Sequence, residues 1–216
     1  MTYCKTLWVS ILVLLCVGCL TAANVPPPAT DLPSPGDGKV ATAVLSGGCF
    51  WGVEALYERL KGVIAVVAGY AGGKAEDAHY ERVGSGRTKH AESVQITYDP
   101  SQISYGKLLQ VFFAVVHDPT QIDRQGPDFG PQYRSVIWYS TDGQKQVAQA
   151  YITQIARAHV FRDPIATGVS LLPGFFPAED HHQHYLQHNP NDPYIVQNDM
   201  PKLRALEQQF PDLLKP

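Results

Sequence analysis

Cysteine is scarce in this chain of 216 residues, and its placement excludes most structural uses of the residue. Three of the four cysteines, Cys4, Cys16 and Cys19, fall in an apolar segment at the N-terminus, so the rest of the chain has Cys49 alone. A lone thiol forms neither an internal disulfide nor a zinc site built on several cysteines. Cys49 is therefore either a small buried apolar residue or a reactive group.

Charged residues are also few. They make up 17% of the sequence, and the formal net charge is only -3. This balance excludes the strongly basic surface typical of proteins that bind nucleic acids or anionic membranes. Because 44% of the residues are apolar and no internal repeat is visible, the composition indicates one globular domain.

A long apolar run occurs near the N-terminus, at residues 7–20. It follows one basic residue, Lys5, and ends in small residues up to Ala23. This run is shorter than a membrane span, which takes about 20 apolar residues. Residues 1–23 are therefore predicted to be a secretory signal that sends the protein to the periplasm. A retained anchor and lipid attachment at Cys19 are the alternatives.

The composition divides the rest of the chain into a linker and one domain. Residues 24–39 are rich in proline, glycine and aspartate and predict a linker with no core of its own. Residues 40–216 are predicted to form the folded domain. Hydrophobic patterns predict strands at residues 40–45, 62–69, 91–98, 135–139 and 165–172. They predict helices at residues 50–60, 105–116, 144–158, 178–188 and 202–210.

The order of these elements indicates the fold class. Strands and helices alternate, which predicts an α+β fold, either a two-layer sandwich or a mixed sheet. The apolar composition of residues 62–69 predicts a strand that is buried on both faces. Two long loops, residues 72–88 and 117–133, carry aromatic and charged side chains, which favours a functional role for both.

Cys49 stands between two glycines and a helix-like run, in the sequence LSGGCFWGVEALYERLKG. If the glycines form a turn and Phe50 opens a helix, the sulfur lies at a helix N-terminus. Free backbone N–H groups and the helix dipole favour a thiolate there, and a thiolate is a nucleophile. Phe50 and Trp51 are then either ordinary core residues or an apolar pocket for a small group such as a methyl.

Three further residues could donate a proton or a hydrogen bond to a substrate. Glu92 shares one face of its predicted strand with the apolar residues at every second position, so it is expected to point inward. A carboxyl group in an apolar pocket has a raised pKa and can donate a proton near neutral pH; a solvent-facing carboxylate is the alternative. Tyr80 and Tyr133, in the two long loops, are either packed aromatics or phenolic donors to a substrate oxygen.

The histidine-rich sequence EDHHQHYLQH suggests a metal site at first sight. His181, His184 and His188 would share one face of the predicted helix. The sequence has no HExxH pattern and no cysteine partner for such a site. We therefore interpret these histidines as a polar helix face and predict no metal.

Five segments together resemble a known family. In chain order they are GCFWGVEALYERLKGV, GYAGG, HAESVQITYDP, DPTQIDRQGPDFGPQYRS and AEDHHQHYL. They are similar to the peptide methionine sulfoxide reductases of the A class, from about residue 40 to residue 194. Enzymes of this kind each repair one epimer of methionine sulfoxide. The resemblance implies a ferredoxin-like core with a shallow active-site basin, and it makes residues 40–216 a catalytic domain that acts on methionine-S-sulfoxide in proteins.

The resemblance also implies catalytic roles. Cys49 matches the nucleophile that attacks the sulfoxide sulfur and becomes a sulfenic acid. Glu92 matches the acid that protonates the sulfoxide oxygen. Tyr80 and Tyr133 match the hydroxyl groups that bind this oxygen.

Other positions match residues that bind the substrate. Phe50 and Trp51 match the pocket for the S-methyl group, and Asp128 matches a carboxylate that positions the substrate. His182 and Tyr185 fall in a family motif without an assigned task.

The chain departs from the family pattern in its cysteines. Many members carry one or two resolving cysteines near the C-terminus, whereas this chain has none after Cys49. We therefore expect a monomeric one-cysteine enzyme without a bound cofactor, restored by an external thiol, either a thioredoxin-like protein or a small molecule. Lys89 and Pro131 are smaller departures, and both are expected near the substrate basin.

Two other function classes compete with a reductase. A cysteine hydrolase or acyl transferase would pair Cys49 with a histidine such as His182, although no matching triad signature is present. A catalytically inactive binding module for oxidised proteins would lack Cys49 or Glu92, and both are present. Turnover of esters would favour the first alternative, and full biological effect of a Cys49→Ser variant would favour the second.

Overall fold

The computed structural model describes residues 24–34, 36 and 38–216. The predicted secretory signal, with its three cysteines, lies outside these residues. The domain is built on a six-stranded sheet with the order β7-β6-β1-β3-β2-β8. Its strands are β1 (Ala41–Ser46), β2 (Val63–Ala71), β3 (Ala91–Tyr98), β6 (Val136–Tyr139), β7 (Gly168–Leu171) and β8 (Phe175–Pro177). Neighbouring strands are antiparallel except β6 and β7, which are parallel, so the predicted mixed sheet is confirmed.

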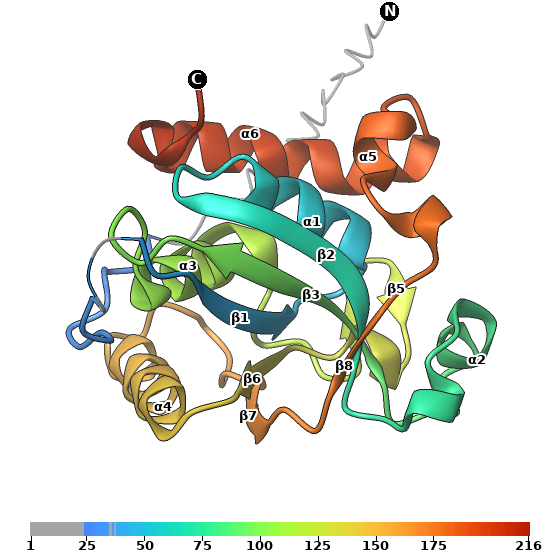
Figure 1. Ribbon diagram of the computed structural model, residues 1–216, viewed down its shortest axis with the longest axis horizontal. Helices are drawn as coiled ribbons and strands as arrows, with labels where there is room; N and C mark the ends of the chain where they lie inside the picture. Colours follow the sequence, from blue (N-terminus) through green and yellow to red (C-terminus); the bar gives the residue numbers. More distant parts are fainter. Residues whose placement is uncertain (1–23, 35, 37) are drawn as a thin grey trace, which may run out of the picture.

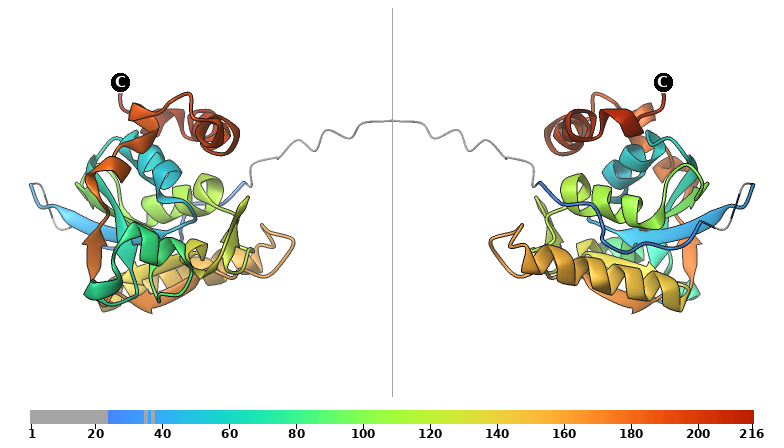
Figure 2. Two further views of the ribbon diagram at one scale, coloured as in Figure 1. Left: turned by 90° about the vertical axis from the view of Figure 1, so that its right-hand side faces the viewer. Right: turned by 90° about the vertical axis from the view of Figure 1, so that its left-hand side faces the viewer.

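The described residues also form α-helices. They are α1 (Phe50–Glu58), α2 (Tyr80–Gly84), α3 (Tyr105–Val111), α4 (Asp142–Arg157), α5 (Tyr185–His188) and α6 (Met200–Gln209). Some of these helices pack on the sheet and others on α1 (Figure 1). Two π-helical segments, Phe112–Val116 and Ile195–Asp199, continue α3 and lead into α6. Figure 2 shows α1 and α3 on the same side of the curled sheet, and the main apolar core lies between these two layers. The two-layer α+β architecture therefore agrees with the prediction.

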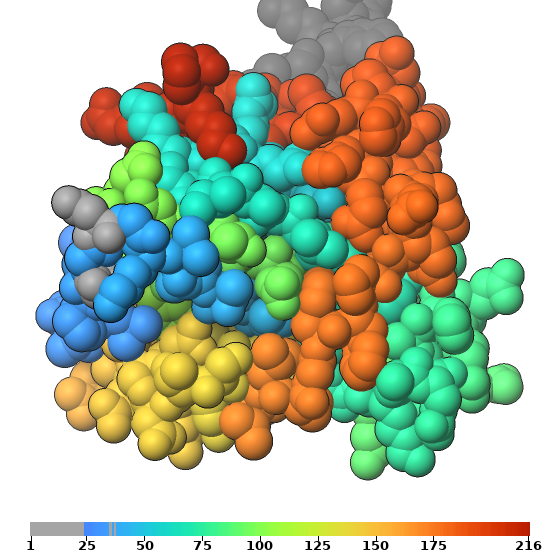
Figure 3. Space-filling model, in the orientation of Figure 1, coloured from blue at the N-terminus to red at the C-terminus, as the bar shows by residue number. Residues whose placement is uncertain are grey.

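The segment before β1 packs against the domain. Val25 is 4% exposed and belongs to the main core, and the Tyr151 hydroxyl donates to the Pro26 carbonyl at 2.7 Å. The carboxylate of Asp31 accepts hydrogen bonds from the start of α3. Figure 3 shows the blue N-terminal part of the domain beside the yellow surface of α4. Residues 24–34 have no regular structure, and Val25 adds to the core of the domain, so the segment predicted as a linker without a core of its own packs on the domain.

β2 differs from the expected strand in its first half. Ile64 is 56% exposed, whereas Ala68 and Tyr70 are fully buried. The reason is the length of the neighbouring strand, because β8 pairs only with Gly69–Ala71. The start of β2 is therefore an edge of the sheet, and the prediction of burial on both faces was wrong there.

The predicted helix over residues 178–188 is broken. A single 3₁₀ turn (Asp180–His182) is followed by His184 with a left-handed φ of 53° and then by the short α5. The Gln183 side chain explains the break, because its amide both accepts from the Ala68 N–H and donates to the Ala68 carbonyl. This side chain continues the pairing along the β2 edge, so the segment does not form the continuous helix that would place its histidines on one face.

The two long loops contain short elements of their own. Residues 72–88 include a 3₁₀ turn (Ala75–Asp77) and α2, and residues 117–133 include the hairpin of β4 (Arg124–Gln125) and β5 (Asp128–Phe129) and a 3₁₀ turn (Pro131–Tyr133). Both loops meet at the C-terminal end of β1, where α1 begins. Within the part of the chain that the structure describes, no helix is long and apolar enough to cross a membrane.

Candidate active site

Cys49 caps the N-terminus of α1, as the sequence predicts. The turn before it needs glycine, because Gly48 has a left-handed φ of 98°. A Cβ atom on Gly48 would also lie 2.6 Å from the Gln125 side chain, which is hydrogen-bonded in turn to the backbone of Asp118. The turn therefore packs directly on the 117–133 loop, and Cys49 is left 8% exposed between them.

Gly52, in the first turn of α1, makes room for a buried carboxylate. A Cβ atom at this position would lie 2.1 Å from Oδ1 of Asp199, which is 1% exposed. Asp199 accepts a hydrogen bond from Lys202 at 3.2 Å, and its other oxygen has no partner in the described chain. Sequence analysis missed Asp199, because a single aspartate far along the chain carries no spacing signal toward Cys49.

Replacing Gly52 with alanine tests this close approach. Alanine normally stabilises a helix interior relative to glycine by about 0.5–1 kcal/mol, but here its methyl group would overlap Asp199. We expect a net loss of about 1–3 kcal/mol in the free energy of unfolding, measured by urea denaturation. Gly84→Ala is the matched control, because nothing lies within 4 Å of a Cβ atom there. A Gly52→Ala protein as stable as the control would contradict the packing described.

Glu92 lies buried beside the first turn of α1. It is 2% exposed, and its Oε2 accepts the backbone N–H of Phe50 at 3.1 Å. Burial raises the pKa of Glu92 to about 8, and the Phe50 N–H opposes this increase only in part. The inward orientation predicted for this residue is confirmed, and near neutral pH most molecules hold a proton here.

The thiol of Cys49 is held in its neutral form. Burial raises its pKa well above the ordinary value, and the nearby carboxylates of Glu92 and Asp199 raise it further. The backbone N–H of Trp51 acts in the opposite direction but is outweighed. The thiolate expected from the helix N-terminus alone is therefore not the resting form of this site, because the sequence pattern did not show the surrounding carboxyl groups.

Tyr80 and Tyr133 reach the same site from the two loops. Burial, with the charges of Glu92 and Cys49, raises the pKa of Tyr80 to about 12 and that of Tyr133 still further. Both phenols therefore keep their protons and can donate. Tyr80 is held at the start of α2 by Glu179, whose carboxylate accepts the Tyr80 N–H at 3.0 Å. Sequence analysis gave Glu179 no role.

Asp128 faces the thiol from the small hairpin. Burial raises its pKa, and its Oδ2 accepts the hydroxyl of Tyr194. Asp128 also contributes to the raised pKa of Cys49 and Glu92, which places its carboxyl group within their electrostatic range. Tyr194 is a second residue that sequence analysis missed; it marks the end of the region of resemblance, and no pattern of spacing connects it with residue 128.

Aromatic rings fix Trp51 on three sides. Tyr185 stacks on the indole with ring centroids 3.7 Å apart and planes 10° apart, and Tyr194 meets it edge-on at 6.0 Å. The indole N–H donates to Nδ1 of His182 at 3.2 Å. Phe50 is 1% exposed and lies behind this group, with its ring 5.4 Å from that of His182. His182 and Tyr185 therefore position Trp51, a task that the sequence did not reveal.

These contacts disfavour a cysteine–histidine pair. His182 directs Nδ1 to Trp51 and packs its ring on Tyr80 at 4.2 Å. Burial lowers the pKa of His182, so the ring is neutral near pH 7. Burial has the largest effect on the pKa of Cys49, and the next largest effects come from carboxyl groups and a backbone N–H. The site thus offers a thiol, a proton-donating acid and phenols rather than a nucleophile beside a base.

Sequence comparisons point to one family. Residues 41–214 match the model of the family described as "Peptide methionine sulfoxide reductase". A Mesorhizobium japonicum protein named "Peptide methionine sulfoxide reductase MsrA 2" is 55% identical over 172 residues, covering 80% of this chain and 88% of that protein. A Synechocystis protein of the same name is 54% identical over 173 residues, covering 80% of this chain and 81% of that protein.

Solved structures agree with the fold. Mxr1 from Saccharomyces cerevisiae in its reduced form has a TM-score of 0.64 and 33% identity, covering 72% of this chain and 89% of that one. Methionine sulfoxide reductase A of Corynebacterium diphtheriae has a TM-score of 0.60 and 34% identity, covering 77% of this chain and 83% of that one. Both likenesses support the predicted α+β fold.

Proposed function

The chain belongs to the peptide methionine sulfoxide reductase family and reduces methionine sulfoxide in proteins, and we propose that it acts on the S epimer through a sulfenic acid at Cys49. One observation carries this proposal, the pairing of a buried thiol with a protonated carboxyl group. Glu92 accepts the N–H of Phe50, the residue next to Cys49, and has a pKa of about 8. Such a pair suits a substrate that must receive a proton while a sulfur attacks it.

The proposed reaction moves one oxygen atom between two sulfur atoms. Glu92 gives its proton to the sulfoxide oxygen, while the phenols of Tyr80 and Tyr133 donate hydrogen bonds to the same atom. Cys49 attacks the substrate sulfur and gives its thiol proton to the Glu92 carboxylate. The hydroxyl group then moves from the substrate sulfur to the Cys49 sulfur, as the bond between the two sulfur atoms breaks. The net reaction converts a sulfoxide and a thiol into a thioether and a sulfenic acid, so methionine gains two electrons and Cys49 loses them.

The neutral thiol fits this sequence of events. The thiolate is the nucleophilic form of cysteine, yet burial and nearby carboxylates keep Cys49 protonated at rest. We propose that the thiol proton leaves only when the bound sulfoxide has taken the proton of Glu92, which then becomes the acceptor. The site is thereby protected from reaction with oxidants that do not take the proton of Glu92.

We further propose how the enzyme is restored and where it works. With no cysteine after Cys49, an external thiol attacks the sulfenic acid, releases water and forms a mixed disulfide. A second thiol then frees Cys49. A thioredoxin-like protein and a small thiol both meet this need. The apolar segment at residues 7–20 supports export to the periplasm, where we expect the protein to act as a monomer.

A racemic substrate tests the proposed stereochemistry. With a peptide that contains both epimers of methionine sulfoxide and an excess of dithiothreitol, we expect the S epimer to be consumed and the R epimer to remain. Chiral chromatography of the remaining substrate gives the result directly. Consumption of both epimers, or of the R epimer alone, would contradict the proposal.

A further inference from the structure

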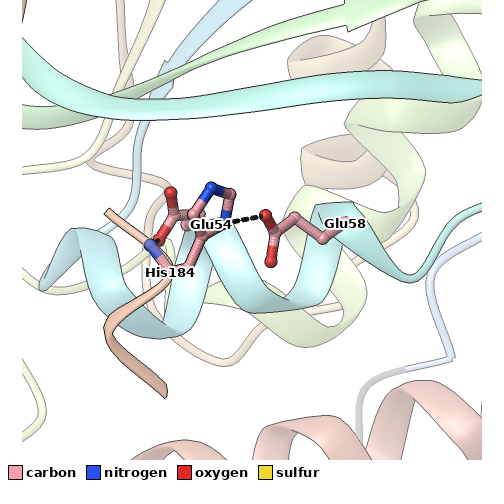
Figure 4. Close-up of side chains that lie close together, drawn as sticks. All are labelled: Glu54, Glu58 and His184. Atoms are coloured by element: carbon pink, nitrogen blue, oxygen red, sulfur yellow. Dashed lines mark hydrogen bonds and ion pairs between the residues drawn. The ribbon is translucent and has the colours of Figure 1, made fainter. Parts of the chain in front are cut away.

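A second group of polar side chains lies along α1, from the middle of the helix to its C-terminal end (Figure 4). Glu54 and Glu58 occupy positions i and i+4 of α1, so they share one helix face. Figure 4 shows both carboxyl groups close to the ring of His184, which comes from the segment between β8 and α5. One possible ligand atom from each of these three residues lies within 4.8 Å of the others.

Ordinary hydrogen bonding leaves part of this group unexplained. Nδ1 of the His184 ring lies 2.6 Å from Oε1 of Glu58, and the backbone N–H of His184 donates to Oε2 of Glu54 at 2.8 Å. Oε1 of Glu54 has no partner in the described chain, although Glu54 is only 1% exposed. A buried carboxylate oxygen without a hydrogen-bond partner costs free energy. The unpartnered Oε1 of Glu54 therefore indicates a bound ligand that would supply the missing interaction.

The donor set defines the chemistry of this ligand. Two carboxylates and one imidazole are oxygen and nitrogen donors that bind zinc-type divalent ions. A tetrahedral ion with bonds of about 2.1 Å requires donors about 3.4 Å apart, so small side-chain rotations would close the group around it. A surface groove lined by Glu58, Leu186 and Gln187 opens beside it and gives access from solvent.

We propose that Glu54, Glu58 and His184 bind a divalent transition-metal ion of the zinc type. The ion replaces the bond between His184 and Glu58, takes the free oxygen of Glu54, and keeps a water or a further oxygen as its fourth ligand. This site differs from the metal site that the histidine-rich sequence suggested at first sight, since His184 is its only histidine. It ties α1 to the segment that carries His182 and Tyr185, the residues that position Trp51.

Cobalt(II) added to the full-length protein tests the site. Cobalt takes the place of zinc, and its visible absorption differs between oxygen and nitrogen ligands and thiolate ligands. The spectrum therefore distinguishes cobalt at the proposed site from cobalt bound by Cys49 or by the N-terminal cysteines. We expect one cobalt bound through oxygen and nitrogen, and a thermal unfolding midpoint that rises with added cobalt. Glu58→Gln and His184→Gln should each weaken this binding by at least about tenfold, the loss that even second-shell changes cause at metal sites.

His188→Gln is the matched control. His188 lies on α5 with its ring 6.3 Å from that of His184, outside the proposed ligand set, and it should bind cobalt like the natural protein. The side chains of Glu58 and His184 are 18% and 48% exposed, so their replacement should leave the protein folded, which the unfolding midpoint without metal verifies. Equal binding by all four proteins, a spectrum of thiolate ligands alone, or no binding would overturn the proposal, and none of these results depends on sulfoxide reduction.

Discussion

Replacing Glu92 with glutamine is expected to lower kcat/KM for methionine-S-sulfoxide by about 10²- to 10⁴-fold, the contribution typical of a general acid. Glutamine keeps the shape of the side chain and can still accept the Phe50 N–H, but it has no acidic proton to give to the sulfoxide oxygen. Steady-state rates at low substrate concentration measure the loss. Glu81→Gln, an exposed residue on α2, is the control and should leave the rate unchanged.

The same residue sets the alkaline limit of activity. Because the pKa of Glu92 is about 8, kcat/KM of the natural protein should fall as the pH rises through this value and the acid loses its proton. The ionised carboxylate also opposes formation of the Cys49 thiolate. In the Glu92→Gln protein this fall should be absent. A profile that keeps rising above pH 9 would show that another group donates the proton.

Glu92 also costs stability, and the sign follows from its pKa. In the unfolded chain a glutamate loses its proton near pH 4.5, but in the folded protein it does so only near pH 8. The folded state thus binds more protons at this residue between these values, so the contribution of Glu92 to stability is fully present below pH 4.5 and is lost as the pH rises to 8. Glu92→Gln should therefore stabilise the protein more at pH 8 than at pH 5, by a few kcal/mol, at about 1.4 kcal/mol for each pKa unit. Unfolding midpoints at the two pH values measure this difference.

Replacing Cys49 with serine should abolish turnover. A hydroxyl group cannot accept the sulfoxide oxygen as a sulfenic acid, so the expected rate is that of the uncatalysed reaction with the reductant. The pocket should remain, because Trp51 is held by Tyr185, Tyr194 and His182 and not by the thiol. We therefore expect a sulfoxide peptide still to change the fluorescence of Trp51.

The control for this prediction uses the N-terminal cysteines. A protein with serine at Cys4, Cys16 and Cys19 should retain full turnover, since these residues belong to the predicted signal. Turnover by Cys49→Ser at more than a trace level would mean that another thiol is the nucleophile. Loss of activity in the triple variant alone would mean the same.

Local patterns predicted the parts of the site that lie close together in the sequence. The glycines before Cys49 predicted the turn and the start of α1, and the alternation around Glu92 predicted its burial. Both signals arise from backbone geometry, which depends on a few neighbouring residues. For the same reason the local patterns predicted five of the six strands of the sheet. The exception is β8, which has only three residues.

Long-range contacts could not be predicted in this way. Asp199 reaches α1 because Gly52 has no side chain, and neither residue indicates the other in the sequence. The Gln183 amide breaks a predicted helix by bonding to the β2 edge, which only the folded arrangement brings near. The raised pKa of Cys49 depends on burial and on carboxyl groups from three separate elements, which the pattern of a helix N-terminus does not reveal.

The central claim is that Cys49 accepts the sulfoxide oxygen and that no other residue of the domain resolves the product. A single turnover without reductant tests it most directly. Residues 24–216 are mixed with an excess of a racemic methionine sulfoxide peptide, the remaining epimers are separated, and the oxidation state of Cys49 is read by mass spectrometry. The account predicts one equivalent of methionine from the S epimer and one sulfenic acid at Cys49, with no free thiol left. No methionine with Cys49 still a thiol, or continued turnover without reductant, would contradict it.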